Sequence, residues 1–259
     1  MSLNRPIEDW QGRRIWIIGA STGIGAALAH ALLMRGARVA LSARKREALE
    51  AIAARFDSAA TLVVPLDVTE LATLEAAAAD ITRLWGGHDL VLFVAGDYKP
   101  ARAWDFELAS ARQIVDTNLM GIFNTLSVVV KPLLAQGHGG IALVSSVAGY
   151  RGLPQALIYG ATKAAVINLA ETLYLDLHPK GLDVYVINPG FVKTPMTAGN
   201  QFKMPALITS EEAAEAMIAG LARGEFEIHF PKRFTRVMKF LRLLPYSLYF
   251  RLVSRGTGL

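Results

Sequence analysis

One stretch near the start of the chain decides the fold: Ile17-Ile18-Gly19-Ala20-Ser21-Thr22-Gly23-Ile24-Gly25. It joins the apolar run 14–18 to a helix-like segment that ends near Arg35. Glycines at such a turn let the backbone approach a phosphate, and the free N–H groups of the following helix attract its charge. The turn predicts a dinucleotide-binding site, with a purely structural turn as the alternative. The residues expected at the cofactor are Gly19, Ser21, Thr22, Gly23, Ile24 and Gly25.

Apolar and helical segments alternate along the rest of the chain. The strand-like runs are 14–18, 39–43, 61–65, 90–95, 141–145, 184–188 and 227–230, and helical patterns cover 45–56, 71–84, 106–135, 157–177 and 210–223. This alternation implies right-handed crossovers and a parallel sheet with helices on both faces. We expect a single Rossmann-like, doubly wound α/β domain over residues 1–230, followed by a tail over residues 231–259.

The composition fits one large domain with a sizeable core. The chain has 259 residues, of which 53% are hydrophobic and 19% charged. It has no cysteine, which excludes disulfides and thiolate chemistry and fits a reducing cytosol. No signal peptide is evident, and no uncharged apolar run reaches the ~18 residues of a membrane-spanning helix. We therefore expect a cytoplasmic protein. The five histidines show no metal-ligand spacing and are assigned to the surface or to loops, so no metal is expected.

The basic charge is concentrated in the tail. Residues 232–259 contain seven lysines and arginines and no acid, whereas the rest of the chain has 20 basic against 22 acidic residues. The main domain is therefore not expected to bind nucleic acid. Within 231–253 the basic residues accompany apolar ones at helical spacing, and Pro245 interrupts the pattern. Such a segment can lie on an anionic membrane surface, pack on a partner subunit or the substrate pocket, or be idle.

The end of the second strand predicts the choice between NAD(H) and NADP(H). An acid about 20 residues after the glycines would bind the ribose 2′-OH of NAD. The sequence here is Leu41-Ser42-Ala43-Arg44, without an acid. Arg44 offers donors for a 2′-phosphate, so NADP(H) is expected to be preferred over NAD(H). A solvated position at the start of a helix is the alternative for Arg44.

A tyrosine and a lysine on the expected helix 157–177 are spaced for proton transfer. Tyr159 and Lys163 are four residues apart, which places both side chains on one helix face, about 6 Å apart along the axis. The ammonium would lower the pKa of Tyr159 below its usual value of about 10, so the phenol could exchange a proton near neutral pH. The same pair is common in proteins and by itself does not establish catalysis.

Together with other motifs, this pair makes the chain resemble the short, single-domain branch of the short-chain dehydrogenase/reductase family. The resemblance covers residues 12–230. The matching motifs are Gly19-x-x-x-Gly23-x-Gly25, Asp67-Val68, Asn118, Ser146 thirteen residues before Tyr159, Lys163, and Asn188-Pro189-Gly190 followed by Val192 and Thr194. The resemblance implies a mainly parallel seven-stranded sheet in the order 3-2-1-4-5-6-7 and a homo-dimer or homo-tetramer.

The resemblance also implies roles for individual residues. Ser146 would hydrogen-bond the substrate oxygen, and Tyr159 would exchange the proton. Lys163 would lower the pKa of Tyr159 and hold the nicotinamide ribose, and Asn118 would help to position a water that relays protons from Lys163. Further cofactor contacts are implied for Asp67, Val68, Gly96, Pro189, Gly190, Val192 and Thr194.

The chain departs from the family pattern after the fourth strand. The family usually shows Asn-Asn-Ala-Gly there, whereas this chain has Phe93-Val94-Ala95-Gly96, and Ile18 stands where a threonine is more usual. Gly96 still allows backbone contact with the adenosine ribose. We expect altered local hydrogen bonding rather than lost activity.

The residues expected around the substrate are mainly apolar. Substrate contacts are assigned to Tyr98, Val147, Tyr150, Phe191 and Met196. The loop 191–207 also carries Phe202 and Met204, and the resemblance implies that it covers the substrate. We expect hydride transfer between NADP(H) and a carbonyl or secondary alcohol of an apolar or lipid-like molecule. The alternatives are an inactive protein that senses the cofactor and a scaffold that acts at a membrane surface through its tail.

Overall fold

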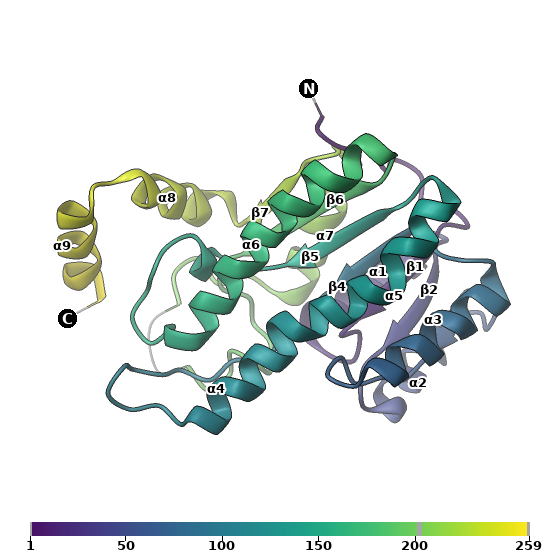
Figure 1. Cartoon of the computed structure of the whole chain (residues 1–259), viewed down its shortest axis with the longest axis horizontal. Coiled ribbons are helices and arrows are strands. Elements are labelled where there is room, and N and C mark those ends of the chain that lie inside the picture. Colours follow the sequence, from purple (N-terminus) through teal and green to yellow (C-terminus); the bar gives the residue numbers. More distant parts are fainter. Residues whose placement is uncertain (1, 201–203, 258–259) are drawn as a thin grey trace.

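A computed structural model describes residues 2–200 and 204–257, and within these ranges the chain builds one parallel sheet (Figure 1). Its strands are β1 (Arg14–Ile18), β2 (Arg38–Ser42), β3 (Thr61–Val63), β4 (Leu90–Phe93), β5 (Gly140–Val144), β6 (Asp183–Pro189) and β7 (Glu227–Phe230). They lie in the order β3-β2-β1-β4-β5-β6-β7, and every neighbouring pair is parallel. The predicted Rossmann-like fold and strand order are confirmed.

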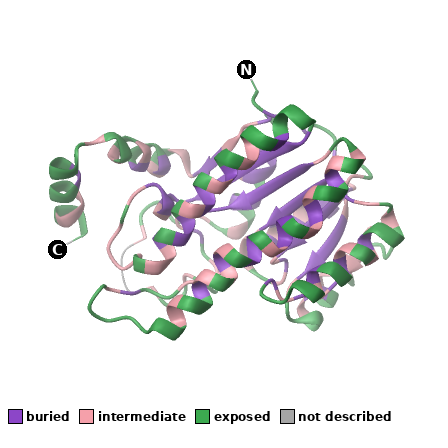
Figure 2. Cartoon of the chain, in the orientation of Figure 1, coloured by how far each residue is buried: buried purple, intermediate pink, exposed green. Residues whose placement is uncertain are grey.

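Helices cover both faces of the sheet. One face carries α1 (Gly23–Leu33), α2 (Arg46–Ala53) and α7 (Ser210–Ala222). The other carries α3 (Leu71–Trp85), α5 (Gly121–Gln136) and α6 (Leu157–Leu177), with α4 (Leu108–Val115) packed on α6. Because both faces are covered, β4, β5 and β6 are buried along their whole length, as the purple strands of Figure 2 show.

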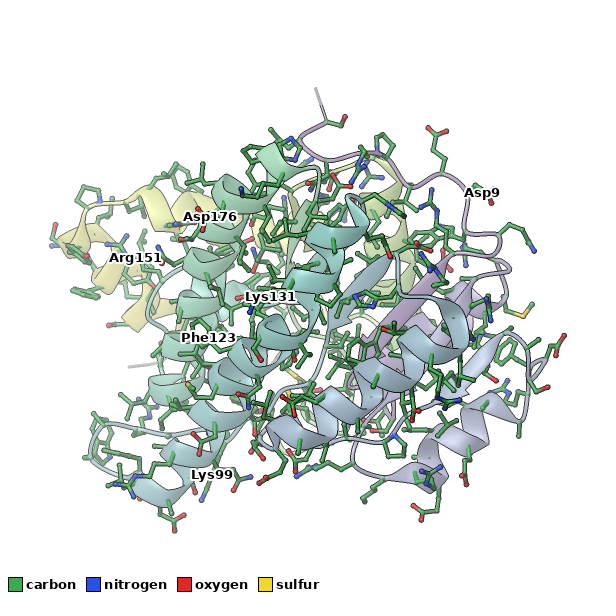
Figure 3. The ribbon with its side chains drawn as sticks, turned by 45° about the vertical axis from the view of Figure 1, so that its right-hand side comes forward. Asp9, Lys99, Phe123, Lys131, Arg151 and Asp176 are labelled. Carbon is green, nitrogen blue, oxygen red and sulfur yellow. The ribbon has the colours of Figure 1, made fainter. Side chains whose placement is uncertain are left out.

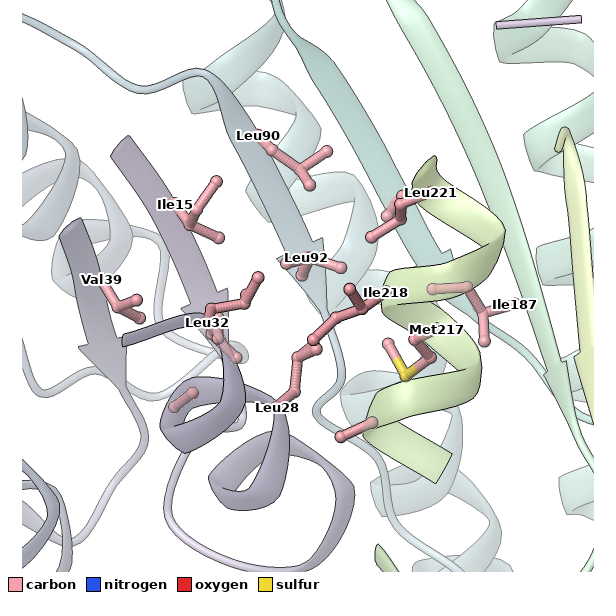
Figure 4. Close-up of a cluster of buried hydrophobic side chains, with 14 of the residues drawn as sticks. Ile15, Leu28, Leu32, Val39, Leu90, Leu92, Ile187, Met217, Ile218 and Leu221 are labelled. Atoms are coloured by element: carbon pink, nitrogen blue, oxygen red, sulfur yellow. The ribbon is translucent and has the colours of Figure 1, made fainter. Parts of the chain in front are cut away.

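The core between α1, α7 and the sheet fixes the position of the glycine turn (Figure 4). Leu28 and Leu32 of α1 meet Met217 and Ile218 of α7 above Leu92 of β4. Each fully buried side chain of this size stabilises the fold by roughly 1.5–3 kcal/mol. Since α1 is held in this way, its N-terminus stays at the carboxyl edge of the sheet, where β1 ends.

The helix expected over residues 106–135 is divided in two. A π-helical turn, Asp116–Met120, separates α4 from α5. Taken together, the helical residues 108–136 are long and apolar enough to cross a membrane by length and composition alone, but Ile122, Val129 and Leu133 pack into the hydrophobic core of the domain. Turns of π-helix occur often at functional sites, and this one contains Asn118.

Two histidines are buried. Placing all five at the surface or in loops was wrong for His229, which lies on a strand, whereas His88 lies in the loop between α3 and β4. His88 is 3% exposed and lies edge-on to Trp16, with ring centroids 5.8 Å apart. His229, on β7, is also buried, and its Nδ1 lies 2.6 Å from Thr235 Oγ1. Both histidines are buried by contacts between separate elements of the fold. Local sequence patterns do not predict such contacts.

Beyond β7 the chain forms two further helices, α8 (Lys232–Leu243) and α9 (Tyr246–Thr257), separated at Pro245 as expected. Figure 1 shows them in yellow, extending away from the sheet. Since α8 follows the carboxyl end of a parallel strand, it emerges from the same edge of the sheet as the glycine turn.

Candidate active site

A cavity of about 460 Å³ opens at the carboxyl edge of the sheet. The ends of β1, β2, β4, β5 and β6 contribute to its wall, because all these strands run in the same direction. Its volume is within the usual range for small-molecule sites, and the carboxyl edge is where ligands bind in open parallel sheets.

The glycine turn forms the floor of this cavity, and its geometry suits a dinucleotide. Gly19 adopts φ +101°, and a Cβ there would lie 2.5 Å from the backbone nitrogen of Ala95. A Cβ on Gly25 would lie 2.0 Å from the carbonyl oxygen of Gly19. Thr22 caps α1 without a side-chain hydrogen bond, so the first N–H groups of the helix are available to an anion.

Every residue assigned to the cofactor lies in the wall of the cavity. These residues are Gly19, Ser21, Thr22, Gly23, Ile24, Gly25, Arg44, Asp67, Val68, Gly96, Tyr159, Lys163, Pro189, Gly190, Val192 and Thr194. The structure therefore brings together positions that are up to 175 residues apart in the chain. Their individual contacts with a cofactor stay predictions.

One end of the cavity is cationic. Arg44 and the neighbouring Lys45 are exposed there, and within the described ranges no hydrogen bond or ion pair occupies either side chain. The end of β2 is held by Ser42, whose hydroxyl donates to the Val64 carbonyl at 2.7 Å and accepts from Trp16 Nε1 at 2.8 Å. Lys45 was not predicted from the sequence, although the basic run at 44–46 could have indicated it.

The other end gathers a serine, a tyrosine and a lysine. Ser146 follows β5 and accepts a hydrogen bond from the backbone of Ala148 at 3.1 Å, while Tyr159 and Lys163 lie on α6. The Tyr159 hydroxyl is hydrogen-bonded to Ser146, and Lys163 Nζ lies 5.6 Å from the centroid of the Tyr159 ring. All three face the same cavity.

Backbone contacts position Lys163 precisely under this end of the cavity. The Ser145 hydroxyl donates to the Lys163 carbonyl at 2.7 Å, which ties the end of β5 to α6. The ammonium donates to the Val144 carbonyl at 2.9 Å, and within the described chain this is its one hydrogen bond. Two N–H groups of a buried ammonium are therefore left for a ligand, which fits the hydroxyls of a cofactor ribose.

Asn118 lies behind the cavity wall and acts as a tether. Its Oδ1 accepts from the Asp97 backbone nitrogen at 2.7 Å, and its Nδ2 donates to the Asp97 carbonyl at 2.9 Å and to Thr162 Oγ1 at 3.2 Å. These bonds join the segment after β4 to α6, where the family pattern would place asparagines on the strand itself. The side-chain amide is thus engaged in structure, and a role for Asn118 in a water relay stays a prediction.

The pKa of Tyr159 shifts opposite to the expected direction. Burial raises it to about 12, the neighbouring Tyr98 adds to the rise, and the hydrogen bond with Ser146 only partly opposes it. Burial also lowers the pKa of Lys163 to about 8. The predicted lowering of the Tyr159 pKa is wrong for this structure, because desolvation of the phenol dominates and the Lys163 ammonium donates its hydrogen bond to a carbonyl. Tyr159 is protonated at neutral pH.

Only part of the expected substrate set reaches the cavity. Met196 lies in its wall, and the Tyr98 ring meets the Tyr159 ring edge-on, with centroids 5.0 Å apart. Tyr98 and the other three residues, Val147, Tyr150 and Phe191, lie outside the wall of this cavity, and their contact with a substrate stays a prediction. Val147 and Tyr150 are buried, the latter with its hydroxyl donated to Glu227, and the Phe191 ring packs 5.6 Å from that of Phe234.

The loop 191–207 is anchored at its base. The backbone nitrogen of Lys193 donates to the Ile208 carbonyl at 2.8 Å, and that of Ile208 donates to the Phe191 carbonyl at 3.1 Å. Thr197, which the sequence did not single out, lines the cavity and donates its hydroxyl to the Val192 carbonyl at 2.7 Å. Phe202 lies outside the described residues.

These features define an oxidoreductase of the Rossmann-fold class. The model of the short chain dehydrogenases matches residues 13–204. The chain belongs to the short-chain dehydrogenase/reductase family.

Similar proteins cover nearly the whole chain. An uncharacterized oxidoreductase of Myxococcus xanthus is 38% identical over 240 residues, which are 92% of this chain and 94% of the relative. One of Staphylococcus haemolyticus is 32% identical over 217 residues, 84% of this chain and 94% of the relative.

Solved structures with the same fold carry NADP. A short chain dehydrogenase from Burkholderia cenocepacia in complex with NADP is 26% identical with a TM-score of 0.82, covering 95% of this chain and 99% of that one. A gluconate 5-dehydrogenase from the same organism, in complex with NADP and tartrate, is 27% identical with a TM-score of 0.79, covering 88% of this chain and 97% of that one.

Proposed function

We propose that this protein is an NADP(H)-dependent oxidoreductase that interconverts a carbonyl and a secondary alcohol on an apolar or lipid-like molecule. The observation that carries the proposal is the convergence of Ser146, Tyr159 and Lys163 on one end of the cavity. When bound, the nicotinamide cofactor supplies or accepts the hydride.

The protein's own groups handle the substrate oxygen and its proton. The Ser146 hydroxyl donates a hydrogen bond to the carbonyl oxygen and stabilises the negative charge that develops on it. Tyr159 is protonated at neutral pH, since its pKa is about 12, and it donates its proton to that oxygen. The Lys163 ammonium lies beside the phenol and stabilises the phenolate that results.

The preference for NADP(H) is supported by the cationic end of the cavity. Arg44 and Lys45 lie on its wall without partners among the described residues, and Ala43 puts no carboxylate beside them. The nearest acid in the wall, Asp67, has Oδ1 accepting hydrogen bonds from the Thr69 nitrogen at 3.0 Å and hydroxyl at 2.8 Å. The two Burkholderia cenocepacia structures with NADP are consistent with this preference.

An apolar substrate is supported by Met196 in the cavity wall and by Tyr98, whose ring contacts that of Tyr159. Met196 approaches Gly96 closely, with its Cε 3.8 Å from where a Cβ would stand, and Tyr98 covers the Tyr159 ring. Thioether and aromatic surfaces favour an apolar group beside the reacting carbonyl.

The test is Tyr159→Phe, which keeps the ring and removes the hydroxyl. NADPH oxidation is followed with long-chain 3-keto compounds, steroids and small diketones. The variant is expected to lose about 10²–10⁴-fold in kcat/KM, the range typical of general acid–base catalysis. Tyr174→Phe is the matched control on α6, since its hydroxyl donates to the Leu3 carbonyl away from the cavity.

Equal rates for wild type and Tyr159→Phe would refute the catalytic assignment. A wild-type protein that binds NADPH but oxidises it with none of these compounds would instead favour the cofactor-sensing alternative.

A further inference from the structure

The helices α8 and α9 carry an unusual surface. The chain from Lys232 onward has seven cations and no acid, and Figure 2 shows α9 as mostly exposed. Large apolar side chains stand in solvent along both helices: Val237, Phe240, Leu243, Tyr246, Leu248, Phe250 and Leu252. We call these residues, together with Arg233 and Arg236, the tail surface.

The two sides of α8 have different tasks. On the inner side Thr235 and Met238 are buried against the domain. The 3.6-residue period places Arg233, Phe240 and Leu243 on the outer side, and the last two side chains are 62% and 81% exposed. The domain therefore buries the inner side of α8, while the apolar side chains of the outer side have no packing partner among the described residues.

The cations of the tail are mostly unpaired. Lys232 and Lys239 reach the carboxylates of Glu225 and Glu227 at 3.5 and 2.6 Å. Over residues 2–200 and 204–257, no carboxylate pairs with the remaining five: Arg233, Arg236, Arg242, Arg251 and Arg255. Apolar side chains interleaved with unpaired arginines complement an anionic bilayer, because the former enter the acyl boundary while the guanidinium groups reach the phosphates.

Arg151 holds the tail to the segment between Ser146 and Tyr159. Its Nη1 donates to the carbonyls of Leu241 at 3.0 Å and Leu244 at 2.6 Å, at the end of α8. Its guanidinium also lies 4.0 Å from the centroid of the Tyr249 ring. Figure 3 shows Arg151 beside the yellow helices. The orientation of the tail is therefore coupled to the catalytic edge of the sheet.

We propose that the tail surface docks on an anionic lipid bilayer and holds the carboxyl edge of the sheet beside it. Electrostatics favour this occupant over a second copy of the chain. Two tail surfaces placed face to face would bring unpaired arginines against arginines, whereas an anionic bilayer neutralises them.

The test measures co-sedimentation of the full-length protein with vesicles. Wild type is expected to bind vesicles of phosphatidylcholine mixed with phosphatidylglycerol and not to bind vesicles of phosphatidylcholine alone. Added salt should release the bound protein. Arg233→Gln with Arg236→Gln should weaken binding about tenfold or more, since each basic residue near such a surface contributes about a fivefold factor. Phe240→Gln with Leu243→Gln should weaken it comparably by removing the apolar insertion.

Matched controls separate the tail surface from the net charge. Arg55→Gln with Lys131→Gln removes the same charge from exposed positions elsewhere, and Met34→Gln removes an exposed apolar side chain. These variants should bind like wild type, and all variants should melt like wild type. Equal weakening by the controls, or no binding of wild type to the mixed vesicles, would overturn the proposal. The proposal would also be overturned if wild type formed a dimer and did not bind the vesicles, and if Phe240→Gln with Leu243→Gln dissociated that dimer. The partner of the tail surface would then be a second copy of the chain.

Discussion

The two ends of the cavity differ in how far their charged and titratable side chains are buried. At the catalytic end Lys163 is buried and Tyr159 is packed beneath Tyr98, and burial shifts both pKa values, to about 8 and about 12. At the cationic end Arg44 and Lys45 stand in solvent. Burial in a low-dielectric environment shifts the pKa of a group that exchanges a proton, and it lowers the stability of the folded protein. A group that only binds a fixed charge can stay hydrated and avoids this loss of stability.

Among the variants that test this difference, Lys163→Met should have the largest effect. We expect activity to fall by at least about 10²-fold, because the phenolate of Tyr159 loses its neighbouring charge. Burial lowers the pKa of Lys163 from 10.5 to about 8, so a buried charge disfavours the folded state below pH 8 and ceases to do so as pH rises toward 10.5. The variant should therefore be more stable than wild type by about 3 kcal/mol at pH 7.

Urea unfolding at pH 7 and pH 10, together with kcat/KM, checks both effects. Lys131→Met, at an exposed position on α5, is the control and should change neither quantity. A stability gain that is the same at both pH values would show that packing rather than charge is responsible.

His88 tests the cost of burial away from the cavity. Burial lowers its pKa from 6.5 to about 4, with the charge of Arg14 contributing. The folded state accommodates the neutral ring but not the charged one. The free energy of unfolding is therefore highest above pH 6.5, where His88 is neutral in both states, and it decreases as pH falls toward 4. Between pH 7 and pH 5 the part of the loss that comes from His88 should be about 2 kcal/mol, and His88→Leu should remove that part without affecting turnover. His229, whose pKa is also lowered by burial to about 4, keeps its own share of the acid sensitivity in this variant.

Thermal unfolding over this pH range measures the effect. His138→Gln, which changes an exposed histidine, should retain the pH dependence of wild type. If His88→Leu retained it as well, the acid sensitivity would belong to other groups.

Arg44→Ala should give the smallest effect and sharpen the cofactor assignment. Loss of a charged hydrogen-bond donor should weaken NADPH binding about tenfold while leaving NADH binding nearly unchanged. Lys45→Ala should behave in the same way, and neither change should alter the melting temperature, because both side chains are exposed. Fluorescence titration with the two cofactors measures the difference, and equal losses for both would remove Arg44 from the 2′-phosphate role.

Much of the fold and of the site could be predicted because it depends on short-range patterns. The alternation of apolar and helical segments indicated a parallel sheet covered on both faces, and the glycine spacing indicated the turn below α1. The strand order came from the resemblance to the family. The positions expected at the cofactor all reached one cavity, since most lie near the carboxyl end of a parallel strand. The spacing of Tyr159 and Lys163 put them on one face of α6.

What the sequence by itself determined is therefore which residues lie where along each element, since spacing and periodicity are properties of the chain. The tertiary structure alone decided which groups lose water and which partners they meet. Tyr150 turns from the cavity to Glu227, 77 residues further on, and His88 is buried against Trp16. The pKa of Tyr159 rises although a lysine lies one turn away. Desolvation and long-range contacts set these outcomes, and both arise only when distant elements pack together.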